Sequence, residues 1–299
     1  MEKVIAQLEQ SGLRVSREEP LSQHTSFRIG GPVRGMVFPE SEAELIQAVR
    51  ILHKAGIVPL LIGNGSNLLP ADTPINRIAI KTQDGVSHLE RLTGNVIYAS
   101  AGTRLSRLAT FARDEGLTGL EFAHGIPGTL GGAIFMNAGA YGGEMTGVVR
   151  RVHYLDKDLT RQVAEADACN FSYRHSRFSD TKELILGAEL ALTPGDPAEI
   201  SRQMAELAEK RRKSQPLDLP SGGSTFKRPQ TGYAAAMIDE AGLKGYTVGG
   251  AQVSMKHAGF VVNCDSATCA DVLAVMKHVE ETVFAQTGIR LEAEVEQIN

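Results

Sequence analysis

The spacing of apolar side chains along the chain predicts a mixture of helices and strands. Apolar residues three and four positions apart, bounded by capping residues or glycine, predict helices at residues 2–11, 41–56, 103–113, 196–213, 233–241 and 266–286. Short alternating or continuous apolar runs predict strands at 33–38, 57–63, 76–81, 95–101, 149–155, 183–192, 246–253, 259–263 and 289–296. Because helices and strands do not alternate strictly, the pattern favours an α+β fold over a doubly wound sheet.

The composition is that of a globular protein with one large domain or two to three smaller ones. The chain has 299 residues, 42% of them hydrophobic, a net charge of −4 and three cysteines without a C-x-x-C pair. The small negative charge argues against a nucleic-acid surface, and the cysteine pattern predicts a reducing cytoplasm and no metal site. No signal peptide and no run of 18 apolar residues is present, so we expect no membrane insertion.

Residues 125–144 form the most unusual stretch, G-I-P-G-T-L-G-G-A-I-F-M-N-A-G-A-Y-G-G-E, with seven glycines and one proline. Glycine lets the backbone approach a ligand closely and adopt positive φ, so this density predicts N–H groups that face an anion. A flexible linker is the alternative, but linkers are rich in serine, proline or charge, whereas Leu130, Ile134, Phe135 and Met136 favour burial. We therefore predict a phosphate- or cofactor-binding turn that leads into a short buried helix.

A second glycine-rich turn, N-G-S-N-L-L-P, occupies residues 64–70. Gly63 and Gly65 supply G-x-G, but the third glycine of a dinucleotide-binding fingerprint is missing, and Pro70 stands where a Rossmann helix should begin. That fingerprint is therefore rejected. The backbone of residues 65–67 would suit an anion, and the same residues are also good turn formers, so the local sequence leaves both interpretations open.

Ser224 lies in S-G-G-S-T-F-K-R-P, residues 221–229, between a glycine pair and a basic pair. The segment lacks G-x-S-x-G, and no histidine or aspartate is placed to activate a nucleophile. Ser224 could be a proton donor or only a hydroxyl of the turn, and the spacing alone favours the turn.

Two basic segments carry further candidate chemistry. Arg174, in Y-R-H-S at 173–176, would hold a carboxylate through two hydrogen bonds, and an ordinary surface arginine is the alternative. The K-R-R-K run at 210–213 is predicted to end a helix, where cations complement the dipole. Binding of a diphosphate is its less favoured interpretation.

Taken together, these motifs resemble those of bacterial UDP-N-acetylenolpyruvoylglucosamine reductases, the MurB family of flavoenzymes. The resemblance covers practically the whole chain, and the glycine and serine motifs are its most specific parts. The motifs occur in the family's order and rough spacing: H-T-S-F-R-I-G-G-P (24–32), G-N-G-S-N-L-L (63–69), the glycine stretch (125–142), Y-R-H-S (173–176), G-G-S-T-F-K-R-P (222–229), G-L-K-G (242–245) and L-E-A-E-V (291–295).

The resemblance implies an FAD-binding fold of the vanillyl-alcohol-oxidase type, with two FAD-binding subdomains followed by a smaller α+β substrate domain. We expect the first subdomain at 1–80, with the closing strand 289–299 as a candidate addition. The second subdomain is expected at 81–195 and the substrate domain at 196–299.

The implied reaction is the NADPH-dependent reduction of UDP-N-acetylglucosamine enolpyruvate to UDP-N-acetylmuramate, a step in peptidoglycan precursor synthesis. The family's motif makes Ser224 the proton donor, while Arg174 and Glu294 hold and polarise the substrate carboxylate. The resemblance is what selects Glu294, because the local pattern does not separate it from Glu292 and Glu296.

The resemblance also distributes the binding residues. Non-covalent FAD would contact Gly63, Asn64, Gly65, Ser66, Asn67, Gly125, Ile126, Pro127, Gly128, Gly131, Gly132, Asn137, Ala138 and Gly139. Candidates for the substrate are Tyr141, Lys227, Arg228, Lys256 and His257, and His257 is equally suited to a structural role.

The chain is similar to the shorter, second subtype of the family. Only 49 residues separate Arg174 from Ser224, and no tyrosine lies between Tyr173 and Tyr233, so the tyrosine loop of the other subtype is missing. A flavin oxidase of the same fold, acting on an alcohol or sugar lactone, is the alternative function. We expect no obligate protein partner.

Overall fold

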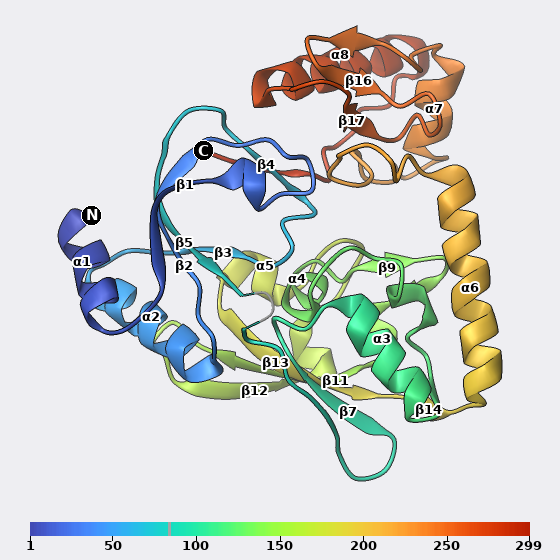
Figure 1. The fold of residues 1–299 in the computed structure, drawn as a ribbon. Coiled ribbons are helices and arrows are strands. Elements are labelled where there is room, and N and C mark those ends of the chain that lie inside the picture. Colours follow the sequence, from blue (N-terminus) through green and yellow to red (C-terminus); the bar gives the residue numbers. More distant parts are fainter. Residues whose placement is uncertain (83–84) are drawn as a thin grey trace. The chain divides into compact units, whose positions relative to one another are not determined.

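The computed structural model describes residues 1–82 and 85–299. Figure 1 shows its helices, which are α1 Glu2–Gln10, α2 Glu42–Lys54, α3 Leu105–Asp114, α4 Leu130–Phe135, α5 Arg177–Thr181, α6 Pro197–Ser214, α7 Ala234–Glu240 and α8 Cys269–Thr287. The strands are β1 Val15–Pro20, β2 Pro32–Val37, β3 Leu60–Ile62, β4 Leu68–Pro70, β5 Ile75–Lys81, β6 Leu89–Arg91, β7 Val96–Ser100, β8 Leu117–Thr118, β9 Gly139–Ala140, β10 Gly143–Glu144, β11 Val149–Leu155, β12 Arg161–Glu165, β13 Leu184–Ala191, β14 Thr193–Pro194, β15 Thr247–Val248, β16 Ala251–Val253, β17 Val261–Asn263 and β18 Glu296–Ile298.

The strands form mostly small sheets, in agreement with the predicted α+β class. The largest has five antiparallel strands in the order β12-β11-β13-β7-β6, and a second has four in the order β1-β2-β5-β3. A third sheet has the order β15-β16-β17, and β18 pairs in parallel with β4. Parallel and antiparallel pairs occur together, because β3 also runs parallel to β5.

Contacts within the chain group it into two compact units. Unit one comprises Met1–Ser16, Gly35–Asn64 and Ile78–Arg211, and unit two comprises Arg17–Arg34, Gly65–Arg77 and Arg212–Asn299. The boundaries of the three domains expected from the sequence stay a prediction.

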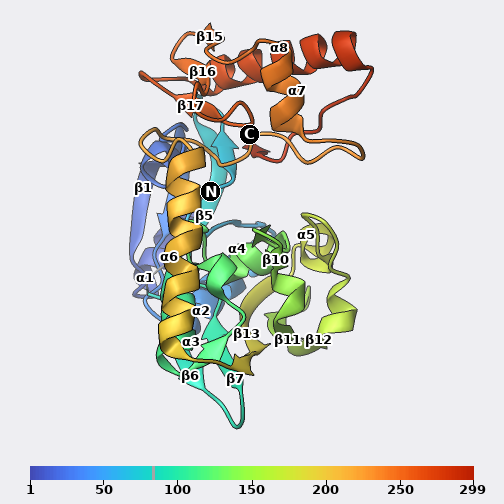
Figure 2. The same cartoon turned by 90° about the vertical axis from the view of Figure 1, so that its right-hand side faces the viewer.

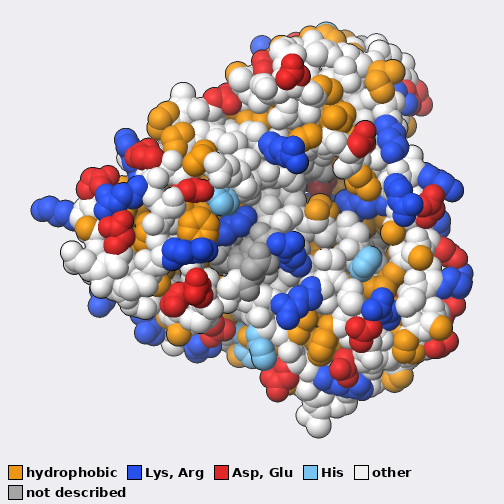
Figure 3. Space-filling view, viewed as in Figure 1, with side chains coloured by type: hydrophobic (Ala, Val, Ile, Leu, Met, Phe, Trp, Pro, Cys, Tyr) orange, Lys and Arg blue, Asp and Glu red, His pale blue; other side chains and the backbone are white. Residues whose placement is uncertain are grey.

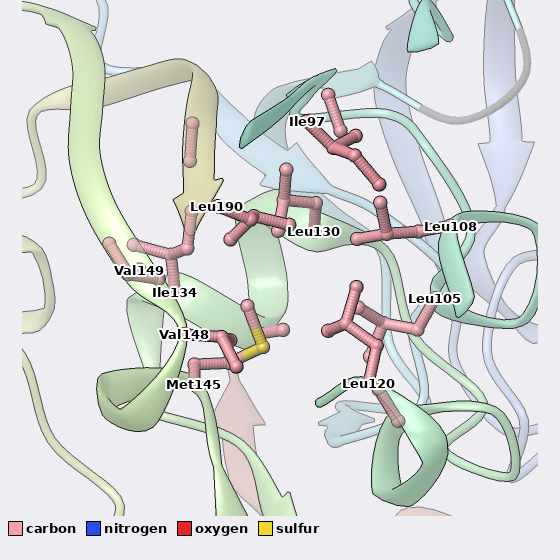
Figure 4. Close-up of a cluster of buried hydrophobic side chains, with 14 of the residues drawn as sticks. Ile97, Leu105, Leu108, Leu120, Leu130, Ile134, Met145, Val148, Val149 and Leu190 are labelled. Atoms are coloured by element: carbon pink, nitrogen blue, oxygen red, sulfur yellow. The ribbon is translucent and has the colours of Figure 1, made fainter. Parts of the chain in front are cut away.

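Unit one contains a core between its five-stranded sheet and helices α3 and α4. Leu105 and Leu108 from α3 and Leu130 and Ile134 from α4 are fully buried in it. Figure 4 shows these side chains pointing toward one another, together with Ile97 of β7. Figure 2 shows α6 as the longest helix of this region, and its Ile200 and Met204 belong to the same core. The glycine-rich stretch is therefore anchored by Leu130 and Ile134 as predicted, whereas Phe135 and Met136 are only half-buried.

Unit two has its own core under α8. Val272, Val275, Val279 and Val283 are fully buried on the inner face of this helix. In Figure 1, α7 and α8 lie beside β16 and β17, which supply further core residues. The predicted inward positions of α8 are confirmed.

Two strand predictions differ from the structure, and several strands were not predicted. The closing strand predicted at 289–296 is reduced to one bridge at Ala293 and to β18 at Glu296–Ile298. The strand predicted at 246–253 is a hairpin, because Gly249 has φ +52 and turns the chain between β15 and β16. Strand β1 was not predicted, since its sequence VSREEP lacks an apolar alternation, and β4, β6 and β12 were not predicted either.

Surface charge and hydropathy agree with the composition. Acidic and basic side chains both occur over the face drawn in Figure 3, in keeping with 31 Lys and Arg and 35 Asp and Glu residues in the chain. None of the helices in the described part of the chain is long and apolar enough to cross a membrane.

Candidate functional site

The glycine stretch of unit one packs closely against the chain that precedes α3. The N–H groups of Leu130 and Gly131 donate to the carbonyls of Thr103 and Ala101 at 2.9 and 2.8 Å. A Cβ on Gly131 would lie 3.0 Å from the Cβ of Ala101. Glycine at 131 is thus favoured by its close approach to Ala101, and the start of α4 is held by the chain itself.

The second glycine-rich turn meets the first at Gly63. A Cβ on Gly63 would lie 2.3 Å from the hydroxyl oxygen of Thr129, and the Asn64 amide donates to the Pro127 carbonyl at 2.8 Å. Thr129 is 1% exposed, and its hydroxyl has no hydrogen-bond partner among the described residues. A buried polar group without a partner is costly, so this junction suits a ligand that brings hydrogen-bonding groups close to bare backbone.

Arg211, near the end of α6, faces the same stretch. Its side chain comes within 3.4 Å of the Cβ position of Gly125, and burial lowers the guanidinium pKa, against the opposing effect of the Tyr141 charge. Across residues 1–82 and 85–299, no carboxylate or hydrogen-bond acceptor pairs with this half-buried cation. Such a group favours an anion beside Gly125.

The remainder of the second turn belongs to unit two. Gly65 has φ +65, and a Cβ there would lie 2.1 Å from the His24 carbonyl, so only glycine fits. The Gly65 carbonyl accepts from the Ser26 N–H at 3.2 Å, and the Asn67 amide donates to the Glu294 carbonyl at 3.0 Å. Residues 65–67 therefore connect the H-T-S motif to the closing segment. Ser66, the middle residue of the three, is half-buried.

Arg174 occupies the turn of a short hairpin in unit one. Ser172 and His175 exchange both backbone hydrogen bonds at 3.1 Å, which places Arg174 at the third turn position with φ +54. Its guanidinium lies 5.1 Å from the Tyr173 ring centre and donates to the Gly139 carbonyl at 3.3 Å. The arginine is thus brought to the glycine stretch.

The segment after Ser224 pairs with the segment around Glu294 in unit two. The Glu294 N–H donates to the Thr225 carbonyl at 2.8 Å, and the Lys227 N–H donates to the Glu292 carbonyl at the same distance. Thr225 is fully buried, and its hydroxyl accepts from the Val261 N–H at 2.9 Å. The serine loop is therefore held between β17 and the closing segment, with half-buried Ser224 one residue from the pairing.

The substrate candidates of unit two differ in their contacts. Lys227 lies 3.4 Å from the Glu292 carboxylate, and the Arg228 guanidinium lies 4.3 Å from the Tyr233 ring centre. Lys256 donates to the Arg212 carbonyl at 2.6 Å, where it caps the end of α6. Arg228 and Tyr233 are both exposed, so this part of the surface presents a cation and an aromatic ring together.

The structure sorts the expected residues into two groups. Ser224, Glu294, Lys227, Arg228, Lys256, His257 and residues 65–67 lie in unit two, whereas Arg174, Tyr141 and the glycine stretch lie in unit one. The expected catalytic and binding roles stay predictions. Thr129 and the burial of Arg211 were missed, although Thr129 stands in the glycine motif and Arg211 in the basic run that the sequence marks. No group of three or more metal-ligating side chains occurs in the part of the chain that the structure describes.

Two family models match the chain. A model described as an FAD binding domain matches residues 33–158, and one described as UDP-N-acetylenolpyruvoylglucosamine reductase, C-terminal domain, matches residues 215–298. The first match contains Gly63, Thr129 and the glycine stretch, where the unpartnered hydroxyl and the close backbone approach fit the diphosphate of FAD. Fold and site define the class: an FAD-binding oxidoreductase, with the α+β architecture expected for it.

Relatives narrow the class to one family. A UDP-N-acetylenolpyruvoylglucosamine reductase of Caldanaerobacter subterraneus subsp. tengcongensis is 44% identical over 279 residues, 93% of this chain and 91% of the relative. One of Agathobacter rectalis is 44% identical over 310 aligned residues, covering 100% of this chain and 98% of the relative. The crystal structure of the Thermus caldophilus enzyme (MurB) is 33% identical, with a TM-score of 0.82 over 96% of this chain and 100% of that chain. The chain belongs to the UDP-N-acetylenolpyruvoylglucosamine reductase family.

Proposed function

We propose that the chain reduces the enolpyruvyl ether of UDP-N-acetylglucosamine to UDP-N-acetylmuramate, with NADPH as the reductant. The observation that carries the proposal is the pairing of residues 225–227 with 292–294, which ties the residue next to Ser224 to the backbone of Glu294 in unit two. The reaction contributes to peptidoglycan precursor synthesis, and its cytoplasmic location stays a prediction.

FAD is the cofactor that the family implies, and bound FAD supplies hydride transfer from NADPH to the terminal methylene carbon of the enolpyruvyl group. Gly63, Gly125 and Gly132 provide backbone that a ligand can approach closely. The buried Thr129 hydroxyl and the half-buried Arg211 guanidinium support a diphosphate at this place, because each is a polar group that the described protein does not satisfy.

Ser224 donates the proton. Addition of hydride to the methylene carbon leaves negative charge on the neighbouring carbon and its carboxylate, and that carbon must be protonated. A serine hydroxyl is a weak acid in water, but proton donation by a positioned group is typically worth roughly 10² to 10⁴ in rate. The next residue, Thr225, makes hydrogen bonds to Gly259, Val261 and Glu294, which supports such positioning.

Arg174 binds the substrate carboxylate through its guanidinium and stabilises the charge that develops on it. Its left-handed backbone supports a functional role, since a non-glycine residue at the third position of this turn costs on the order of 1 kcal/mol. Glu294 helps to orient the carboxylate. Among the substrate candidates, we assign the diphosphate to Arg228 and Lys227, because Lys256 also caps α6.

The flavin absorption spectrum tests the proposal. We expect the FAD-loaded protein to bleach on anaerobic addition of NADPH and to recover when UDP-N-acetylglucosamine enolpyruvate is added. In Ser224→Ala, bleaching should persist while recovery slows by at least about 100-fold, since only the proton donor is removed. The matched control is Ser214→Ala, an exposed serine of the same unit at the end of α6.

Two results would argue against this function. Rapid recovery with oxygen and none with the sugar nucleotide would favour the flavin oxidase of the same fold. Loss of both half-reactions in Ser224→Ala would give Ser224 a structural role.

A further inference from the structure

The side chain of Asn137 joins the glycine stretch to the Arg174 hairpin. Its amide nitrogen donates to the Ser172 carbonyl and to the Glu144 carboxylate, both at 3.0 Å, and its amide oxygen accepts from the Thr146 N–H at 2.9 Å. The residue is 1% exposed. Both amide hydrogens and the oxygen are therefore used by protein groups, which leaves little capacity for a cofactor.

The backbone of Asn137 alone does not require this network. It has φ +44 directly after the α4 C-cap residue Met136, a left-handed position that asparagine and glycine both tolerate. Glycine would end the helix equally well, but it would lose all three side-chain bonds. The choice of asparagine is thus explained by its amide rather than by the turn.

A second hydrogen bond holds the other side of the same hairpin. The hydroxyl of Ser176, which is fully buried, donates to the Phe135 carbonyl at the end of α4 at 2.8 Å. Ser176 stands at the N-cap of α5 but makes no side-chain capping bond there. Arg174 is therefore flanked by two residues, Ser172 and Ser176, that are tied to the end of α4.

We propose that Asn137 is a positioning residue for Arg174, with Ser176 as a second anchor. By fixing the Ser172 carbonyl, Asn137 holds the turn whose left-handed backbone places the guanidinium at the Gly139 carbonyl. This inference rests on the proposed role of Arg174 in binding the substrate carboxylate. It assigns Asn137 to the substrate half-reaction and not to direct contact with FAD.

The test uses Asn137→Gly in the FAD-loaded protein, because glycine keeps the left-handed backbone and removes the side chain that makes the three hydrogen bonds. We expect reoxidation by UDP-N-acetylglucosamine enolpyruvate to slow by about 10- to 100-fold, since small displacements of a positioning group cost this much. The dissociation constant of FAD and the rate of bleaching by NADPH should stay within about two-fold. Asn170→Gly is the matched control, an exposed asparagine with φ +48, and it should change neither half-reaction.

A double-mutant cycle separates positioning from general support of the fold. Arg174→Gln alone should slow the substrate half-reaction, and adding Asn137→Gly should slow it little further, because the two act through one group. Ser176→Ala should reproduce the selective effect, which also covers failure of Asn137→Gly to fold. Weakened FAD binding, an unchanged substrate half-reaction, or full additivity with Arg174→Gln would each overturn the inference. A normal rate in Arg174→Gln would instead reject the proposed role of Arg174, and the inference with it.

Discussion

Left-handed backbone at residues other than glycine marks several side chains around the candidate site. Asn137, Tyr141 and Arg174 have φ of +44, +53 and +54. Tyr141 and Gly142, with φ +53 and +88, form the two-residue turn between β9 and β10, where tyrosine is unusual at the first position. The turn leaves 46% of Tyr141 exposed. At these three positions, which lie around the candidate site, the strained backbone is a reason to test the side chain.

Protonation of His257 should make the stability of the protein depend on pH. Burial is the largest effect on its pKa and lowers it below 6.5, and the charge of Lys244 acts in the same direction, whereas a bond to its own backbone opposes it. The unfolded chain then binds the proton more tightly than the folded one. The contribution of neutral His257 to folding stability is therefore complete above about pH 6.5. It is lost as the pH falls through the lower pKa that His257 has in the folded protein.

We expect the unfolding temperature of the wild-type protein to fall more steeply between pH 7 and pH 5 than that of His257→Gln. Glutamine can still accept the hydrogen bond that the Gly259 N–H donates to His257. His88→Gln is the control, since this histidine is exposed. Equal slopes for wild type and His257→Gln would contradict the prediction.

Helix α8 shows how an element depends on distant residues. Thr268 and Asp271 form a capping box, and Asp72 accepts from the N–H groups of Cys269 and Ala270 at 2.7 and 3.2 Å. The first three N–H groups of the helix are therefore satisfied, and the Asp72 carboxylate complements the positive end of its dipole. The sequence predicts this helix from residue 266, but it reveals nothing of Asp72.

Asp72→Ala should lower the free energy of unfolding by about 1 to 2 kcal/mol, because two N–H groups lose their acceptor. Chemical denaturation measures this loss. Asp218→Ala, at an exposed loop position of the same unit, should change it by less than about 0.5 kcal/mol. An equal effect of the two substitutions would show that Asp72 does not support α8.

The reactivity of the three cysteines can probe both units of the molecule, because they lie in different environments. Cys169 is buried in a core of unit one and Cys269 in the core of unit two, whereas Cys264 is exposed. Burial raises the pKa of Cys169 and of Cys269 to about 11, with a smaller contribution from Asp72 at Cys269. At pH 8 only roughly one part in a thousand of either thiol would be the reactive thiolate.

A thiol reagent at pH 8 should therefore modify one cysteine per native chain and three per unfolded chain. Cys264→Ser should remove the fast reaction in the native protein and leave two slow equivalents. Fast modification of a second cysteine in the native state would mean that one of the two cores opens readily. Formation of a disulfide is not needed to explain the stability, since all three cysteines are free.

The sequence by itself determined the α+β class, most helices, the two glycine-rich turns and the family, because these depend on local periodicity, backbone freedom and motifs read in order. Only the tertiary structure decided which groups meet: Asn137 with Ser172, Thr225 with Glu294, and Asp72 with Cys269. These partners lie 35, 69 and 197 residues apart, the middle value being the difference of 294 and 225. A local sequence pattern shows that a side chain is polar or that a turn needs a residue with positive φ. The hydrogen bond that the side chain makes depends on the path of the whole chain, so its partner can be read only from the tertiary structure.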